Sequence, residues 1–373
     1  MARLGIIADD LSGACDAAAE FASRDFSCLV DLEEGLHGVG EVDVLAVSTE
    51  TRIAPAIEAS ANVVAAFERM RRAGIATVYK KIDSTLRGNC RVEIDALLST
   101  SEFERAVILP AFPETRRQVR SGSLYINDDP SPAFHIPSLL GEQNLRCITS
   151  DECKDQMALG KGLFIVDASN RNELRQAAQF LWTRLAGTLL VGSAGLAAEI
   201  AELMRKDAGA AHHAQPRPIT ATGKPLFFAI GSTHDQTGVQ VNFLKRDPKI
   251  EFIDLKAGWD SIARQKLLDN KDVVLSIDCN RIDFSQLGKV RKLAREHLIS
   301  AFIATGGYTA RMVCGTLQAR AICVCRNLLP GIAIGILIGG EADGLTIVTK
   351  SGGFGTADTL AQVPCLLREE KAA

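Results

Sequence analysis

Residues 76–98 read ATVYKKIDSTLRGNCRVEIDALL, and they contain the pattern that decides the fold. The first four residues form an apolar run typical of a short buried strand, and the last seven have the apolar spacing of a helix. Two lysines, Asp83, Ser84 and Arg87 crowd the turn between them. In open α/β sheets, ligands bind just beyond the carboxyl ends of the strands. We therefore expect this turn to form part of a binding site.

The side chains of this turn suit an anionic small molecule rich in hydroxyl groups. Arg87 can grip a carboxylate as a bidentate fork, and Lys81 can act as a point charge. Asp83 can accept a proton or a hydrogen bond from a hydroxyl group. The alternative is a solvated loop in which Asp83 or Ser84 only caps the next helix.

The composition is that of a folded protein with more than one core. A chain of 373 residues exceeds the usual size of a single core, so two domains are expected. A net charge of -3 spread along the chain leaves no footprint for nucleic acid. The ten cysteines are scattered without a Cys-x-x-Cys pair, which favours a reducing compartment. No apolar run reaches the ~18–20 residues that span a bilayer, so we expect a cytoplasmic protein without a membrane partner.

Two further strand ends in the first half carry charged residues. Asp9 and Asp10 follow a short buried strand, and Arg52 lies just past the strand at 42–47. The two carboxylates can serve as helix caps or bind substrate hydroxyls at a strand end. Arg52 can supply a second cation to the same site, or it can be a surface arginine that precedes a helix.

Strand and helix patterns alternate along the whole chain, which predicts an α/β protein. We expect two domains, each a mainly parallel sheet flanked by helices, with the active site in the cleft between them. Residues 1–207 form the expected N-terminal domain and residues 225–373 the C-terminal domain. Residues 208–224 lack apolar periodicity and contain glycine, proline and polar residues, so they are predicted to be a linker.

Glycine-rich turns in the second half favour nucleotide binding. Glycine lets the backbone approach a phosphate, and helix amides then donate hydrogen bonds to it. Three such turns follow predicted strands, at 231–233, 305–307 and 352–355. None of them is a Walker A loop or a Gly-x-Gly-x-x-Gly dinucleotide fingerprint.

Six motifs in this order make the chain resemble a known family. They are Ala8-Asp9-Asp10-Leu11-Ser12-Gly13-Ala14, Lys81-Ile82-Asp83-Ser84-Thr85-Leu86-Arg87-Gly88, Pro110-Ala111-Phe112-Pro113, Gly192-Ser193-Ala194-Gly195-Leu196, Thr305-Gly306-Gly307 and Thr349-Lys350-Ser351-Gly352-Gly353-Phe354-Gly355. The combination resembles the four-carbon acid sugar kinase family, which comprises threonate, erythronate and 3-oxo-tetronate kinases. The resemblance covers nearly the whole chain.

The resemblance implies an N-terminal domain that binds the sugar acid, a C-terminal domain that binds ATP, and transfer of a phosphoryl group from Mg2+-ATP to the 4-hydroxyl. The implied acid-binding residues are Asp9, Asp10, Arg52, Lys81, Asp83, Ser84 and Arg87. The implied nucleotide-binding residues are Ser232, Gly306, Gly307, Gly352, Gly353, Phe354 and Gly355. For catalysis, Asp83 or Asp10 would orient the hydroxyl and Lys81 would steady negative charge. No metal ligand is assigned.

Two positions depart from the family pattern. Tyr308 stands where the pattern usually has aspartate, and Arg116 stands where it has glycine. These departures keep open a sugar-acid sensor or a weakened kinase with the same fold, and a hydroxy-acid dehydrogenase is a further alternative. The sequence leaves open which acid and stereochemistry are used and whether the chain forms a homo-oligomer.

Overall fold

The computed structural model describes residues 2–33, 35–36, 40–154, 160–183, 185–208, 223–277 and 287–369. The chain divides into two compact units. Unit 1 comprises Met1–Cys28 and Gly38–Ala214, and unit 2 comprises Leu29–His37 and Gln215–Ala373. Most of the predicted linker lies outside the described residues, so its boundaries stay a prediction, as does an active site between two domains.

Unit 1 is built on a parallel sheet with the strand order β3-β1-β4-β11-β5-β10-β9. Its strands are β1 (Leu4–Ala8), β3 (Val44–Ser48), β4 (Thr77–Lys81), β5 (Arg105–Leu109), β9 (Leu145–Ile148), β10 (Gly162–Val166) and β11 (Thr188–Gly192). The central strands are almost continuous apolar runs, because helices cover both faces of a parallel sheet. All five residues of β1 and all five of β11 are buried.

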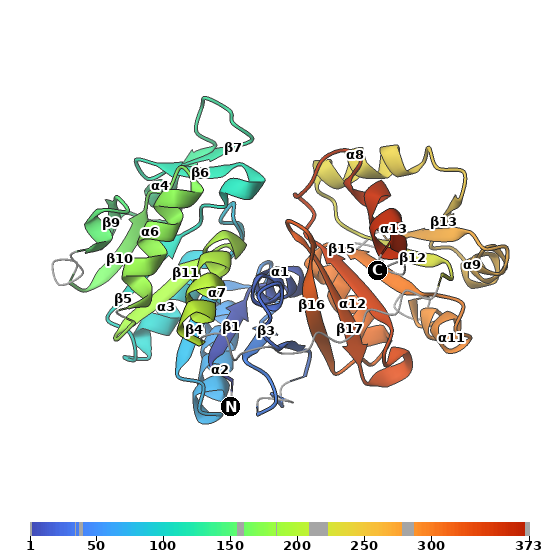
Figure 1. The fold of residues 1–373 in the computed structure, drawn as a ribbon, viewed down its shortest axis with the longest axis horizontal. Coiled ribbons are helices and arrows are strands. Elements are labelled where there is room, and N and C mark those ends of the chain that lie inside the picture. Colours follow the sequence, from blue (N-terminus) through green and yellow to red (C-terminus); the bar gives the residue numbers. More distant parts are fainter. Residues whose placement is uncertain are drawn as a thin grey trace. The chain divides into compact units, whose positions relative to one another are not determined.

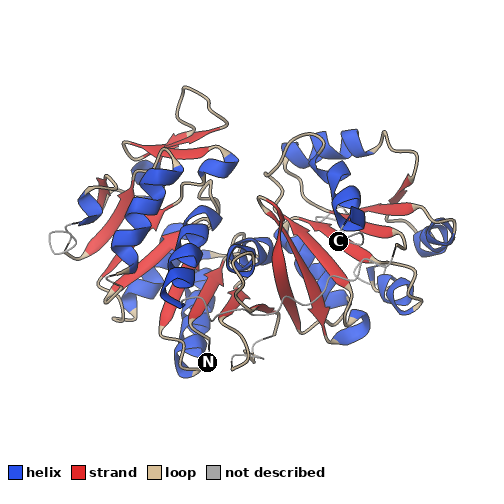
Figure 2. Ribbon diagram, viewed as in Figure 1, coloured by secondary structure: helices blue, strands red, loops and turns tan. Residues whose placement is uncertain are grey.

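The helices of unit 1 form two layers (Figures 1 and 2). They are α1 (Leu11–Ala22), α2 (Ala56–Arg72), α3 (Cys90–Ser99), α4 (Ile136–Leu140), α6 (Arg171–Trp182) and α7 (Ala194–Ala208). α2 packs beside α3 in one layer, and α7 packs against α1 and α6 in the other. The amphipathic pattern explains the burial of α2, because Ala59, Val63, Ala66, Phe67 and Met70 recur at helical spacing and are all buried.

A small antiparallel sheet is added to unit 1 by the strands β6 (Arg117–Arg120), β7 (Ser123–Ile126) and β8 (Phe134–His135). Short 3-10 helices flank this region at η1 (Pro113–Thr115) and η2 (Glu152–Lys154). The strand β7 lies in the middle of this sheet and pairs with both neighbours. The hairpin begins directly after η1, so it brings Arg117 back beside the main sheet.

Unit 2 is built on a mixed sheet in which β13, β14, β12, β15 and β18 are parallel, and β17 runs antiparallel to both β18 and β16. Leu29–Asp31 of β2 (Cys28–Asp31) lies next to β16. The other strands are β12 (Leu226–Ile230), β13 (Ile250–Asp254), β14 (Asp272–Ser276), β15 (Ala301–Thr305), β16 (Ala321–Leu329), β17 (Ile332–Ile338) and β18 (Thr346–Lys350).

Helices also flank the sheet of unit 2 (Figure 2). They are α8 (Asp235–Leu244), α9 (Trp259–Leu268), α11 (Val290–Arg295), α12 (Gly307–Thr316) and α13 (Thr359–Glu369), with a short 3-10 helix η3 (Gly340–Ala342). Buried residues of α8 and α13 join one hydrophobic core with Phe228, Ile303 and Val348 of the sheet. This packing fixes the glycine turn after β18 against the start of α8.

The α/β class and the mainly parallel sheets are confirmed, and the structure corrects several local expectations. Lys80 and Lys81 belong to β4 and are buried, rather than lying in the turn that follows it. β2 and β16 have no counterpart in the predicted elements. Among the described residues, no helix is both long and apolar enough to cross a membrane.

Candidate active site

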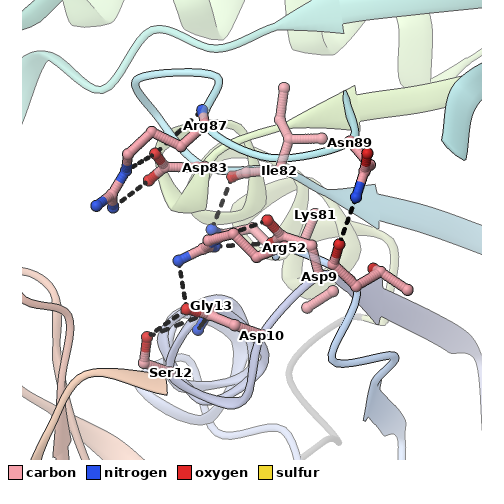
Figure 3. A network of polar contacts seen from close by, with 12 residues as sticks. Asp9, Asp10, Ser12, Gly13, Arg52, Lys81, Ile82, Asp83, Arg87 and Asn89 are labelled. Carbon is pink, nitrogen blue, oxygen red and sulfur yellow. Dashed lines mark hydrogen bonds and ion pairs between the residues drawn. The ribbon is translucent and has the colours of Figure 1, made fainter. Parts of the chain in front are cut away.

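The charged residues of unit 1 meet at the carboxyl edge of its sheet (Figure 3). Ala8 at the end of β1 is level with Ser48 of β3 on one side and Lys81 of β4 on the other. The segments that follow these three strands therefore emerge side by side, because parallel strands end at the same edge. This register brings the segments that carry Asp9, Arg52 and Asp83 to one edge, so Arg52 joins the same cluster and is not an isolated surface arginine.

Arg52 binds both aspartates that follow β1. Its Nε donates to Asp9 Oδ2 at 2.7 Å, its Nη2 donates to Asp9 Oδ1 at 2.8 Å, and its Nη1 donates to Asp10 Oδ2. Burial would raise the pKa of Asp9, but the charge and hydrogen bonds of Arg52, together with the charges of Lys80 and Lys81, outweigh burial and lower that pKa. The pKa of Asp10 is raised, because burial and the neighbouring Asp9 charge together outweigh the lowering effect of the Arg52 charge.

Asp10 also caps helix α1, so the expectation that one of the two carboxylates serves as a helix cap is confirmed for Asp10. Its Oδ1 accepts a hydrogen bond from Gly13 N at 2.6 Å, and its Oδ2 accepts one from Ser12 Oγ at 3.1 Å. A Cβ on Gly13 would lie 2.8 Å from Asp10 Oδ1 and 3.4 Å from Lys81 Nζ. The first turn of α1 therefore favours glycine, because the capping carboxylate of Asp10 approaches its backbone closely.

Asp83 is paired within its own turn. It accepts hydrogen bonds from Arg87 Nε at 2.5 Å, from Arg87 Nη2 at 3.1 Å and from Thr85 Oγ1 at 2.6 Å. Burial would raise the pKa of Asp83, but the hydrogen bond from Arg87 and the charge of Arg52 hold it well below its usual range. Ser84 is buried beside it, whereas the side chain of Arg87 is 48% exposed.

A buried ion pair beneath this edge went unnoticed at the sequence level. Lys80 Nζ lies 2.7 Å from Glu93 Oε2, and both side chains are almost wholly buried. The other oxygen of Glu93 accepts a hydrogen bond from Thr51 Oγ1. Asn89 Nδ2 donates to the backbone oxygens of Thr51 and Ala54 at 2.7 and 2.8 Å. These contacts tie β4 and the start of α3 to the loop that carries Arg52.

Asp16 and Arg117 also belong to the charged cluster, although neither was a candidate from the sequence. Asp16 is 2% exposed and interacts electrostatically with Lys81, Asp10 and Arg117. Arg117, at the start of β6, interacts in the same way with Asp83. Two signals pointed to them: Asp16 lies three residues after Gly13 on the same helix face, and Arg117 follows the Pro110–Pro113 turn.

Arg116 adopts the left-handed backbone conformation, with φ of 58°. It is the residue that ends η1 and turns the chain into β6. Glycine takes this conformation without a steric cost, whereas other residues do not. The glycine of the family pattern at this position thus has a backbone reason, and its replacement by Arg116 costs stability without altering the side chains of the cluster.

In unit 2, three predicted residues converge at the ends of β12, β15 and β18. A Cβ on Gly352 would lie 2.2 Å from Ser232 Oγ, and a Cβ on Gly306 would lie 3.3 Å from Ser232 Cβ. Thr237 Oγ1 donates to Ser232 Oγ at 3.0 Å or to Gly352 O at 3.1 Å. The backbone at 352 lies so close to the Ser232 hydroxyl that a side chain there would displace it, and such close approach to a glycine backbone is typical of phosphate-binding turns.

The remaining predicted nucleotide residues surround this turn. Gly307 begins α12, and a Cβ on Gly353 would lie 2.9 Å from His234 Nε2. Gly355 has φ of 90°, a conformation that favours glycine. Phe354 is buried against Gly331, so its ring anchors the turn from below. Tyr308, in the first turn of α12, is 42% exposed.

Lys350 supports the glycine turn from inside the sheet. Its side chain is fully buried, and its Nζ donates to Ser351 O at 2.9 Å and Gly352 O at 3.2 Å. Burial lowers its pKa to about 7. By holding these two carbonyls inward, Lys350 favours a conformation in which amides of the turn face outward.

A resident metal centre made of protein ligands alone is not evident in the parts of the chain that the structure describes, where no three His, Cys, Asp or Glu residues are grouped to hold an ion. Mg2+ in phosphoryl-transfer sites is usually held by one or two carboxylates together with substrate phosphates and water. The donors found at the two strand edges are therefore compatible with an ion that arrives with a nucleotide.

Comparisons with known proteins agree with this division of the chain. A family model described as a sugar-binding N-terminal domain matches residues 4–135, and one described as a nucleotide-binding C-terminal domain matches residues 279–360. A crystal structure of a Haemophilus influenzae protein has the same fold, with a TM-score of 0.70 and 20% identity, and the match covers 99% of both chains.

Curated relatives match the chain almost from end to end. It is 31% identical over 400 residues to the D-threonate kinase of Bordetella bronchiseptica, covering 99% of this chain and 98% of the relative. It is 25% identical over 415 residues to a 3-oxo-tetronate kinase of Cupriavidus necator, covering 95% of each. The resemblance seen in the six ordered motifs is thereby confirmed, and the chain belongs to the four-carbon acid sugar kinase family.

Proposed function

We propose that this chain uses ATP to phosphorylate the 4-hydroxyl of a four-carbon sugar acid such as threonate, erythronate or 3-oxo-tetronate. The acid binds at the carboxyl edge of the unit 1 sheet, and the nucleotide binds at the glycine turns of unit 2. Family membership supports the reaction class, and the arrangement of charges at each edge supports the assignment of the ligands.

The observation that carries the proposal is that the Lys81 ammonium is buried with hydrogen-bond donors to spare. It is buried beside the first turn of α1, and its one hydrogen bond in the described parts of the chain goes to Ile82 O at 2.9 Å. A lysine has three N–H donors, so two remain for a ligand. A compact anion, such as the carboxylate of a sugar acid, satisfies both.

Arg52 and Arg87 have roles other than the direct binding of the substrate carboxylate that the sequence suggested. Each is already bonded to aspartate, so in this proposal Arg52 fixes the positions of Asp9 and Asp10, and Arg87 fixes Asp83. The outward N–H groups of Arg87 remain accessible, since its side chain is 48% exposed. We assign the substrate carboxylate to Lys81 with support from Arg87, and the hydroxyl groups to the fixed carboxylates.

Of the two candidate carboxylates, Asp10 is the better acceptor for the proton of the reacting hydroxyl. A proton acceptor works best when its pKa approaches the working pH. The pKa of Asp10 is raised, whereas that of Asp83 is held well below its usual range. Asp10 therefore takes the proton as the oxygen attacks, while Asp83 orients a neighbouring hydroxyl and keeps its negative charge.

On the nucleotide side, the cradle formed by Gly352, Gly306 and Ser232 fits the phosphates of ATP. The Gly352 backbone lies against the Ser232 hydroxyl, and Lys350 holds two carbonyls of the turn from beneath. When bound with ATP, Mg2+ neutralises charge on the phosphates during transfer. Ser232 and the amides of the turn bind and orient the phosphate groups.

The test is an assay of ADP release with Mg2+-ATP and a panel of D- and L-threonate, D- and L-erythronate and the 3-oxo acids. At least one acid should give turnover far above the rate without acid. Asp10→Asn should then lower kcat at least 100-fold, and Asp83→Asn should mainly raise KM for the acid. ATP binding without turnover of any acid would favour the sensor, and wild-type turnover by both variants would refute the assigned roles.

A matched pair of glycine variants tests the nucleotide side. Gly352→Ala places a methyl group 2.2 Å from Ser232 Oγ, so we expect KM for ATP to rise at least tenfold while KM for the acid stays unchanged. Gly238→Ala in α8 is the control, because a Cβ there meets no atom within 4 Å. Equal ATP kinetics in the two variants would contradict the assignment.

A further inference from the structure

Asp16 carries a buried carboxyl oxygen, Oδ1, that has no hydrogen-bond partner among the described residues. Asp16 lies in α1 and is 2% exposed. Buried polar atoms are nearly always hydrogen-bonded, because leaving one unpaired costs free energy. An unpaired carboxyl oxygen inside a functional cluster therefore points to a partner that arrives with the ligand.

The groups around Asp16 place it in the acid site. Asp16 interacts electrostatically with Lys81 and Tyr79 of β4 and with Arg117 of β6. It interacts in the same way with Glu20 of its own helix and with Asp10, which caps that helix. Gly13 lies one helical turn before Asp16, and a Cβ there would lie 3.4 Å from Lys81 Nζ. The face of α1 that meets the Lys81 ammonium is thus the face that carries Asp16.

We propose that Asp16 determines substrate specificity by bonding the oxygen on an inner carbon of the sugar acid. This inference rests on the proposed function and names a further contact in the same site. As a carboxylate, Asp16 accepts a hydrogen bond from a hydroxyl group, which favours threonate-type acids. As a carboxylic acid, it donates a hydrogen bond to an oxo group, which favours 3-oxo acids, because a ketone oxygen can only accept.

Both forms of Asp16 are available near neutral pH. Burial raises the pKa of its carboxyl group to about 7. The Lys81 charge opposes this rise, and the Glu20 and Asp10 charges add to it. Raising the pH should therefore improve kcat/KM for a hydroxy acid relative to its oxo counterpart. A site that hydrogen-bonds a substrate group can reject an analogue without it by up to about 10⁴-fold, so a change of tenfold is well within reach.

The experiment measures kcat/KM for a four-carbon hydroxy acid and its 3-oxo counterpart between pH 6 and 8.5. In the wild-type chain, the ratio of hydroxy to oxo acid should rise at least tenfold. In Asp16→Asn the ratio should be constant, because an amide both donates and accepts and does not titrate. Taking the ratio cancels the effects of Asp10 and Lys350, which act equally on both acids.

Glu20→Gln is the matched control. Glu20 is a buried carboxylate one turn further along α1, but it is paired with Arg24 Nη1 at 3.0 Å. This variant should keep a ratio that rises with pH, with the midpoint moved to lower pH because the Glu20 charge helps to raise the pKa of Asp16. If only one acid is a substrate, its own kcat/KM is measured against pH. The value should rise with pH for a hydroxy acid and fall for an oxo acid. Asp16→Asn should lack this change, whereas Glu20→Gln should keep it.

The outcomes separate the two proposals. An active wild type whose ratio is constant with pH overturns the role of Asp16 even if the variant fails to fold. A ratio that rises equally in wild type and Asp16→Asn overturns it as well. A wild-type chain that neither turns over nor binds any acid of the panel, measured by calorimetry, overturns the proposed function and this inference together.

Discussion

Replacing Glu93 with glutamine removes the carboxylate charge that faces the Lys80 ammonium across 2.7 Å. Neither side chain is exposed to water, so the variant leaves the Lys80 amine in the interior without a counter-ion. Besides the glutamine amide, the acceptors within reach in the described residues are the Lys81 and Ile7 carbonyls at 3.0 and 3.5 Å. Removing one partner of a buried pair costs about 3–5 kcal/mol. We expect a loss of that size in the free energy of unfolding of unit 1.

The assay is urea unfolding followed by hydrogen exchange of peptides from β4 and α3, which reports unit 1 separately from unit 2. Glu102→Gln is the control, since Glu102 pairs with Arg71 at 2.8 Å but both side chains are about half exposed. An exposed pair is worth about 0–1 kcal/mol. A loss below about 1 kcal/mol for Glu93→Gln, equal to the control, would refute the reasoning.

The same variant should also change the kinetics, because Glu93 holds Thr51 and Thr51 precedes Arg52. Thr51 N donates to Asp9 O at 2.9 Å, so a shift of this loop moves the residues that position both aspartates. We expect a higher KM for the acid. The double variant Lys80→Met with Glu93→Leu should recover most of the stability, because an apolar pair can replace a buried ion pair, but should leave KM raised.

Two further predictions concern stability. The folded-state pKa of Lys350, about 7, lies below its ordinary value of 10.5, so its contribution to stability is present above pH 10.5 and is lost as pH falls to 7. The free energy of unfolding should rise by up to about 5 kcal/mol as pH rises from 7 to 10.5. The variant Lys350→Met should lack this rise, which urea midpoints at pH 6, 8 and 10 measure. Equal changes of the midpoint with pH in wild type and variant would contradict the prediction. Arg116→Gly should stabilise unit 1 by about 0.5–1 kcal/mol in thermal unfolding because φ is 58° there, whereas Gln118→Gly in β6 should destabilise it.

The location of the candidate site was predictable because it follows from topology. Once 4–8 and 76–79 are recognised as parallel strands, Asp9 and Asp83 must lie at the same edge. The pairing of the charges was not predictable in this way. Arg52 is 42 and 43 positions from its two aspartates, and only the three-dimensional path of the loop brings its guanidinium between them.

Residues that act from within helices were harder to find than those in turns. Glu93 fits an ordinary helix pattern, and nothing local shows that it faces a buried lysine. Asp16 likewise reads as one polar residue in an alanine-rich helix. Its burial depends on the packing of α1 against both the sheet and α7, which the local sequence does not specify.

The membership of Leu29–His37 in unit 2 has a consequence for biosynthesis. Leu32 N donates to Arg320 O at 2.9 Å, and Arg311 Nη1 donates to Leu32 O at 2.8 Å. At ~5–20 residues per second, the ribosome adds Arg320 about 15–60 s after Leu29. Residues 29–31 of β2 are therefore synthesised long before β16. In the meantime the unit 1 residues that precede and follow them in the sequence can fold. Unit 2 produced alone from residue 225 would lack this strand, leaving the edge of β16 as a template for pairing with another chain.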